Sequence, residues 1–175
     1  ERFVQDYKIP EYDAEILTEE RSLSDFFETT LSAYGGDPKR VSNWIMNDVL
    51  RLIRQAGTTA SALDLPPAHL AEIIQLVDSG TITAGVGKEL LEQARGAEKT
   101  PRQMVEERGL AQVTDTDVLR KAAEKILQAN PTQVESYRAG KVTVLGWFVG
   151  QLMRETGGRA DAKKARELLQ RLLEK

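Results

Sequence analysis

The side chains of this sequence best suited to chemistry are basic ones that lie late in the chain. From Asn130 onward there are nine basic and five acidic residues, a net charge of +4, whereas the remainder has 15 basic and 22 acidic residues, a net charge of −7. Lysine and arginine at this density suit phosphate groups, because each cation can neutralise one phosphate and release its counterion. The basic end therefore predicts contact with a polyanion; a solvated, lysine-rich helix face is the alternative interpretation.

Catalytic and metal-binding constellations find no support in the residue types. The 175 residues include no cysteine and one histidine, His69, which excludes thiolate nucleophiles and any site that needs two histidines from one chain. Carboxylate pairs such as Glu19 and Glu20 are adjacent, and adjacent residues on a helix point about 100° apart. Residues 85–88, Gly-Val-Gly-Lys, lack the leading glycine and the Ser/Thr of a phosphate-binding loop. We expect no catalytic residue, metal ligand or cofactor site in this chain.

Helices must position the cations, because apolar residues recur at helical spacing and no hairpin or sustained alternation indicates a strand. Capping side chains precede prolines at Asp37-Pro38, Thr100-Pro101 and Asn130-Pro131. Proline is favourable at the first helical position, where its missing N–H costs nothing. The predicted fold class is all-α.

The charge changes sign along the chain soon after Gly109, which suggests a domain boundary there. We predict a helical bundle over residues 14–109 and a smaller tail domain of three to four helices over residues 114–175. Residues 1–13 are interpreted as a connector from whatever precedes them, since Pro10 breaks any incoming helix. No run of about 18 apolar residues occurs, so no transmembrane helix is available and we expect no membrane partner. The lack of cysteine is compatible with a cytoplasmic location, which we expect.

The segment from Lys141 to Thr156 is apolar nearly all round, so we expect a helix surrounded by protein. It contains Gly146 and Gly150, and mid-helix glycine costs about 1 kcal/mol relative to alanine. Two such residues four apart predict the close approach of another backbone. We therefore interpret these two, with Gly140 at the preceding turn, as structural glycines. A cleft approached by a ligand backbone is the other interpretation.

The turn that follows, residues 157–161, leads into a helix for which Asp161 is the expected N-cap. Free N–H groups at that helix start, with basic residues around them, form a candidate phosphate site, although the Asp161 carboxylate competes for the same donors. A solvated surface turn is the alternative interpretation. The candidate polyanion contacts of the tail are Arg138, Lys141, Arg154, Arg159, Lys163 and Lys164.

Short motifs occur along the chain in a specific order and spacing: Phe26-Phe27-Glu28, Asp37-Pro38-Lys39, Asp78-Ser79-Gly80-Thr81-Ile82, Tyr137-Arg138-Ala139-Gly140-Lys141 and Leu145-Gly146-Trp147-Phe148-Val149-Gly150-Gln151-Leu152-Met153. They resemble the C-terminal region, after the catalytic domain, in the B subunit of bacterial aspartyl/glutamyl-tRNA(Asn/Gln) amidotransferases. Trp147 replaces the phenylalanine that is more usual in the family. In the family a proline often follows the turn at residues 157–161, and this chain has Ala162 there. Stand-alone YqeY-type proteins share much of this region; the connector Pro10-Glu11-Tyr12-Asp13 favours the B subunit.

This resemblance implies a helical and a tail (YqeY-like) domain of one protein in a heterotrimeric ligase. Such an enzyme converts Glu-tRNA(Gln) to Gln-tRNA(Gln), Asp-tRNA(Asn) to Asn-tRNA(Asn), or both, with glutamine and ATP. The implied partners are tRNA and the amidase (A) and small (C) subunits, and ATP and Mg belong to the catalytic domain that precedes this region. In the family these two domains grip the tRNA. The alternatives are a protein–protein docking module of the same complex and a stand-alone YqeY-type helical protein.

Overall fold

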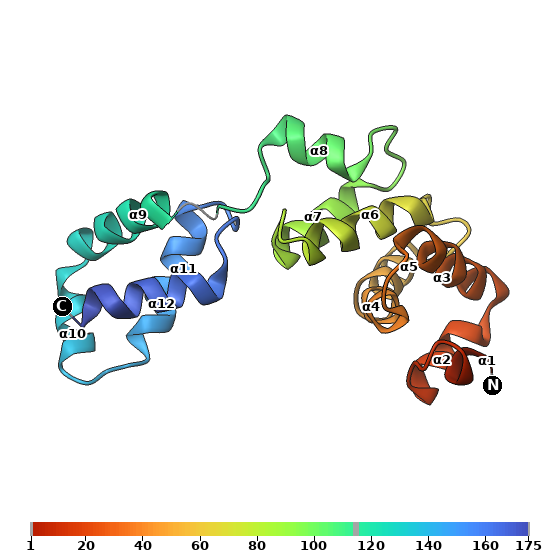
Figure 1. Cartoon of the computed structure of the whole chain (residues 1–175), viewed down its shortest axis with the longest axis horizontal. Coiled ribbons are helices and arrows are strands. Elements are labelled where there is room, and N and C mark those ends of the chain that lie inside the picture. The colour runs from red at the N-terminus through yellow and green to blue at the C-terminus, as the bar shows by residue number, and fades with distance from the viewer. Residues whose placement is uncertain (1, 114–115, 175) are drawn as a thin grey trace. The chain divides into compact units, whose positions relative to one another are not determined.

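The computed structural model describes residues 2–113 and 116–174 (Figure 1). Across them the regular structure is helical, and the one extended pairing is an isolated bridge between Val113 and Ala160. The all-α prediction is therefore confirmed. The chain forms two compact units. The first comprises the residues up to Gly80 together with Gly87–Gly109, and the second comprises Thr81–Val86 together with the residues from Leu110 on.

Most of the helices belong to the first unit: α1 (Arg2–Gln5), α2 (Glu11–Glu19), α3 (Arg21–Tyr34), α4 (Pro38–Trp44), the π-helix η1 (Ile45–Val49), α5 (Leu50–Ala56), α6 (Pro67–Asp78), α7 (Ala84–Gln93, whose first turn is in the second unit) and α8 (Pro101–Arg108). Its core is the apolar stripe of α3, with Phe27 fully buried, against that of α6, with Ile73 and Ile74 fully buried. The apolar stripe of each helix thus becomes core, as helical periodicity requires.

Local capping chemistry sets several of the helix starts. The Asp37 carboxylate accepts a hydrogen bond from the Lys39 N–H, and Thr100 forms a capping box with Gln103. The Thr83 hydroxyl accepts from the Val86 N–H at the start of α7. Asn130 was also expected to cap, but its side-chain amide instead donates to the Ile126 carbonyl at 2.8 Å. That expectation was wrong, because Asn130 turns back onto the preceding helix.

The first ten described residues pack onto α3. Phe3 and Ile9 are buried, and the Phe3, Tyr7 and Phe27 rings lie within 5.2–5.4 Å of one another. The Tyr7 hydroxyl donates to the Glu28 carboxylate at 2.7 Å, and this hydrogen bond raises the pKa of Tyr7. This segment is therefore anchored to the first unit, and its role as a connector stays a prediction.

The second unit is built around α9 (Thr116–Ala129), α10 (Pro131–Arg138), α11 (Val144–Glu155) and α12 (Ala162–Leu173). Helix α11 contacts the other three. The core members are Ala123, Ile126, Leu145, Phe148, Leu152, Ala165, Leu169 and Leu173. One face of α11 is nevertheless exposed, so the expectation of a helix surrounded by protein was wrong.

Non-local hydrogen bonds tie three segments of the second unit together. The Gln112 N–H donates to the Thr81 carbonyl at 2.7 Å, and the Val113 N–H donates to the Arg159 carbonyl at 2.8 Å. The Thr83 hydroxyl donates to the Gly158 carbonyl at 3.0 Å. The glycine turn before α12 is thus held by residues distant in sequence.

No described helix is long and apolar enough to cross a membrane.

Candidate nucleic-acid interface

Four of the six candidate cations have side chains that are free for a ligand. Lys141 lies in the turn before α11, Arg154 lies in the last turn of α11, and Lys163 and Lys164 lie in the first turn of α12. All four are exposed, and none makes an ion pair or side-chain hydrogen bond to the described part of the chain. Because hydrated, unpaired cations are the groups that phosphates bind, these four define the candidate interface.

The other two candidates have guanidinium groups that contact the protein itself. The Arg138 Nε donates to the Leu173 carbonyl at 3.2 Å, at the C-terminal end of α12. The Arg159 Nε donates to the Thr156 carbonyl at 3.0 Å. A cation is favourable where helix carbonyls lack partners, so Arg138 has a structural role at the end of α12.

The cations of α12 form two rows. With about 100° per residue, Lys164 and Arg171 share one side of the helix, and Lys163 and Arg166 share the other. Glu167 lies between the rows, on the side opposite the buried Ala165, Leu169 and Leu173. Composition alone indicated a single basic cluster. A helical wheel of α12 is the sequence signal that divides its cations into these two rows.

The start of α12 is already occupied by a carboxylate. One Asp161 oxygen accepts from the Lys164 N–H at 2.9 Å, and the other accepts from the Gln112 amide at 3.3 Å. The first of these bonds is the main reason that the pKa of Asp161 lies below its usual value. A phosphate at this helix start would meet a charged carboxylate and an N–H that already has a partner. The geometry therefore favours the lysine side chains over the helix N–H groups as phosphate contacts.

The glycines of α11 do not pack against another helix of this chain. A Cβ added at Gly146 or Gly150 would meet no described atom within 4 Å outside the helix's own backbone. The close-packing role predicted for these two residues is therefore wrong. Gly140 differs, because its φ of +101° is a conformation that residues with side chains rarely adopt. The exposed face also carries Thr143 and Trp147, two residues absent from the candidate contacts.

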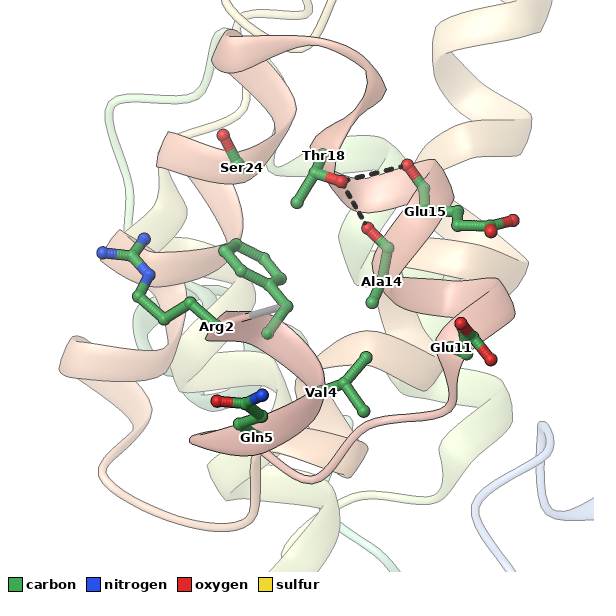
Figure 2. A pocket seen from close by; sticks show the side chains of 9 residues that line it. Arg2, Val4, Gln5, Glu11, Ala14, Glu15, Thr18 and Ser24 are labelled. Carbon is green, nitrogen blue, oxygen red and sulfur yellow. Dashed lines mark hydrogen bonds between the residues drawn. The ribbon is translucent and has the colours of Figure 1, made fainter.

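A separate hollow of about 610 Å³ lies among α1, α2 and α3 of the first unit (Figure 2). Its lining mixes Arg2 with Glu11 and Glu15. The Thr18 hydroxyl donates to the Ala14 carbonyl at 2.7 Å, and so is satisfied within its own helix. The Ser24 hydroxyl likewise donates to a backbone carbonyl, that of Arg21, at 3.0 Å. Among residues 2–113 and 116–174, no group of three or more His, Asp or Glu is placed to hold a metal.

Comparison with known proteins agrees with the resemblance given by the sequence motifs. A family model described as the GatB domain matches residues 25–173. The B subunit of the aspartyl/glutamyl-tRNA(Asn/Gln) amidotransferase of Persephonella marina is 41% identical over 99% of this chain and 36% of its own length. The corresponding protein of Thermosynechococcus vestitus is 42% identical over 96% of this chain and 33% of its own length. That of Clostridium botulinum strain Eklund 17B is 38% identical over the whole chain and 37% of its own length.

This chain spans about a third of the length of those relatives. The resemblance drawn from the sequence motifs is confirmed by matches that extend along essentially the whole chain. The chain belongs to the GatB domain family.

Proposed function

We propose that this chain is the tRNA-binding and positioning region of the B subunit of an aspartyl/glutamyl-tRNA(Asn/Gln) amidotransferase. The observation that carries the proposal is the set of exposed, unpaired cations on the second unit, Lys141, Arg154, Lys163 and Lys164, in a member of the GatB domain family. The chain supplies no reacting group. It holds the misacylated tRNA while a catalytic domain elsewhere in the same protein performs the chemistry.

The whole enzyme, in this proposal, is a cytoplasmic heterotrimer in which the B subunit joins the amidase (A) and small (C) subunits. It uses glutamine and ATP to amidate Glu-tRNA(Gln), Asp-tRNA(Asn) or both. ATP and Mg bind outside this chain. Amide transfer requires the 3′ end of the tRNA to stay in register with a distant catalytic site. Phosphate contacts suit this role, because they fix position and orientation without reading sequence, and structured RNA is recognised largely by shape.

A titration at several salt concentrations tests the proposal. The full chain is titrated with a tRNA(Gln) transcript, and log Kobs is plotted against log[salt]. Lys163→Ala/Lys164→Ala should weaken binding and reduce the magnitude of the slope by roughly one per lost phosphate contact. The matched control is Lys8→Ala/Lys39→Ala, which removes two exposed, unpaired lysines from the first unit. An unchanged slope in the first variant, or an equal change in both, would contradict the proposed interface.

A docking module of the same complex is the second candidate. The acidic residues before Asn130, which give that part a net charge of −7, favour it. If the full chain fails to bind tRNA but binds the amidase and small subunits in a salt-dependent way, docking becomes the better account of this region.

A further inference from the structure

A hollow of about 330 Å³ lies where α10 meets the start of α11. It is lined by Gln133 of α10 and by Thr143, Val144 and Trp147 at the start of α11. Trp147 is 40% exposed, although the neighbouring Phe148 is fully buried. The hollow therefore combines an accessible aromatic ring with a carboxamide and a hydroxyl.

The polar groups of this hollow lack protein partners. Neither the Gln133 amide nor the Thr143 hydroxyl makes a side-chain hydrogen bond to a described residue. Carboxamides and hydroxyls are the side chains that read the edges of nucleic-acid bases. Unpaired RNA bases stack on aromatic rings and form hydrogen bonds through their edges. The three groups are thus of the types that hold one extruded base.

Helix α11 extends this site into a track for the sugar–phosphate backbone. Thr143 lies one turn before Trp147, and Arg154 lies two turns after it on the same face, about 10 Å along the axis. Gly146 and Gly150 lie beside that line, and at neither would an added Cβ meet a described atom within 4 Å. Missing side chains let a partner backbone approach the helix closely.

The charged residues around this helix face favour an anionic ligand. Lys141 precedes the track and Arg154 ends it, and both are exposed and without an ion pair to the described residues. The only acidic residue within α11 is Glu155, which pairs with Lys125 at 2.8 Å. Glu135 on α10 is two residues from Gln133 and so points about 200° away around that helix. A cationic, aromatic and sterically open face is complementary to RNA.

We propose that Trp147 stacks with one unpaired base of the bound tRNA, with Gln133 and Thr143 at the edge of the base. The adjoining backbone passes over Gly146 and Gly150 toward Arg154. This inference rests on the proposed function and deepens it by assigning the site for an unpaired nucleotide.

The test uses the full chain, a tRNA(Gln) transcript and an RNA duplex without unpaired bases. Base–aromatic stacking is worth about 1–3 kcal/mol, so Trp147→Ala should weaken tRNA binding about 5- to 150-fold, and Trp147→Phe should keep most of the affinity. Duplex binding and the salt slope should stay unchanged in both variants, because no charge is removed. Tyr12→Ala is the control, since it removes an aromatic residue of the first unit that is 69% exposed.

Gly150→Leu tests the track independently of Trp147. Leucine is a good helix former and its Cβ would meet no described atom within 4 Å, so the fold should be kept, as circular dichroism would verify, while tRNA binding falls several-fold. Gly85→Leu is the control, because a Cβ at this helical glycine would meet only the Thr83 hydroxyl oxygen, at 3.8 Å.

Three outcomes separate the claims. If Trp147→Ala and Gly150→Leu bind like the wild type while Lys163→Ala/Lys164→Ala is weakened, the base site is overturned and the proposed function stands. If the wild type does not bind the transcript at all, the proposed function itself fails. If the wild-type chain self-associates in a Trp147-dependent way, the face is an interface between copies and the base site is overturned.

Discussion

The two units differ in how ion pairs join their helices. In the first, ion pairs tie helices together: Arg2 to Glu28, Arg40 to Asp78, Arg51 to Glu92, Lys88 to Asp48 and Arg102 to Glu72. In the second, the ion pairs between described residues involve α9, through Arg120–Glu124 and Lys125–Glu155. The lysines at the start of α12 have no such partner among the described residues, and in the first unit the same holds for Lys8 and Lys39. Exposed pairs contribute only about 0–1 kcal/mol each, so the difference matters more for binding than for stability.

The helical glycines of the two units also differ in the space around them. In the first unit, a Cβ at Gly87 would lie 2.9 Å from a Val77 methyl and 3.0 Å from the Trp44 ring. In the second unit, the helical glycines Gly146 and Gly150 face open space. The first unit uses the absence of a side chain for internal packing, whereas the second leaves that space on its surface. This contrast accords with the binding role proposed for the second unit.

The largest expected effect comes from a substitution in the core of the second unit, and it tests whether the two units unfold separately. Phe148→Ala should cost about 3–5 kcal/mol, because it removes the fully buried ring at the centre of a small core. Urea unfolding is followed in single-tryptophan backgrounds, Trp44→Phe and Trp147→Phe, in which the remaining tryptophan reports on one unit. The transition reported by Trp147 should shift to lower urea far more than the one reported by Trp44. Equal shifts would show that the two units unfold as one.

The next effect sharpens the contrast between the glycines. Gly87→Ala should destabilise the protein by about 1–3 kcal/mol through overpacking. Gly146→Ala should stabilise it by about 0.5–1 kcal/mol, because alanine is the better helix former and nothing obstructs its methyl group. Thermal unfolding of the two variants measures both. A loss of stability in Gly146→Ala would mean that this helix face is packed after all.

An effect of similar size concerns the N-cap of α12 and the dependence of its contribution on pH. Asp161→Ala should cost about 0.5–2 kcal/mol at neutral pH through the lost N-cap. The folded-state pKa of Asp161 is lowered, so the carboxylate's contribution is fully present above its unfolded pKa of about 3.9 and is lost as the pH falls through the folded value. Unfolding measured from pH 6 to pH 3 should show wild type and variant converging. A gap that stays constant over that range would exclude this linkage.

Local chemistry made several features predictable. Asp37, Thr83, Thr100 and Asp161 each accept a hydrogen bond from a backbone N–H two or three residues on, so the cap follows from the sequence nearby. The all-α class followed from helical periodicity in the same way. The family motifs identified the relatives because each motif is a short run of consecutive residues that can be recognised from the sequence alone.

Features that depend on distant residues were not predictable. The openness around Gly146 and Gly150 depends on where α9, α10 and α12 pack, and two glycines four apart suit a packed face or a free one equally. The engagement of the glycine turn depends on Thr83, which precedes Gly158 by 75 residues. The π-helix at Ile45–Val49 interrupts a stripe that is regular in sequence. The assignment of individual cations to RNA stays a prediction, since composition alone does not place them on one surface.

Ultraviolet cross-linking of bound tRNA, followed by peptide mapping, tests the central claim most directly. The full chain is irradiated in complex with a tRNA(Gln) transcript, and cross-linked peptides are identified by mass spectrometry. We predict cross-links within residues 133–166, with Trp147 among the sites, and their disappearance at high salt. Cross-links confined to the first unit, with none in the second, would contradict the assignment of RNA binding to Lys141, Arg154, Lys163 and Lys164.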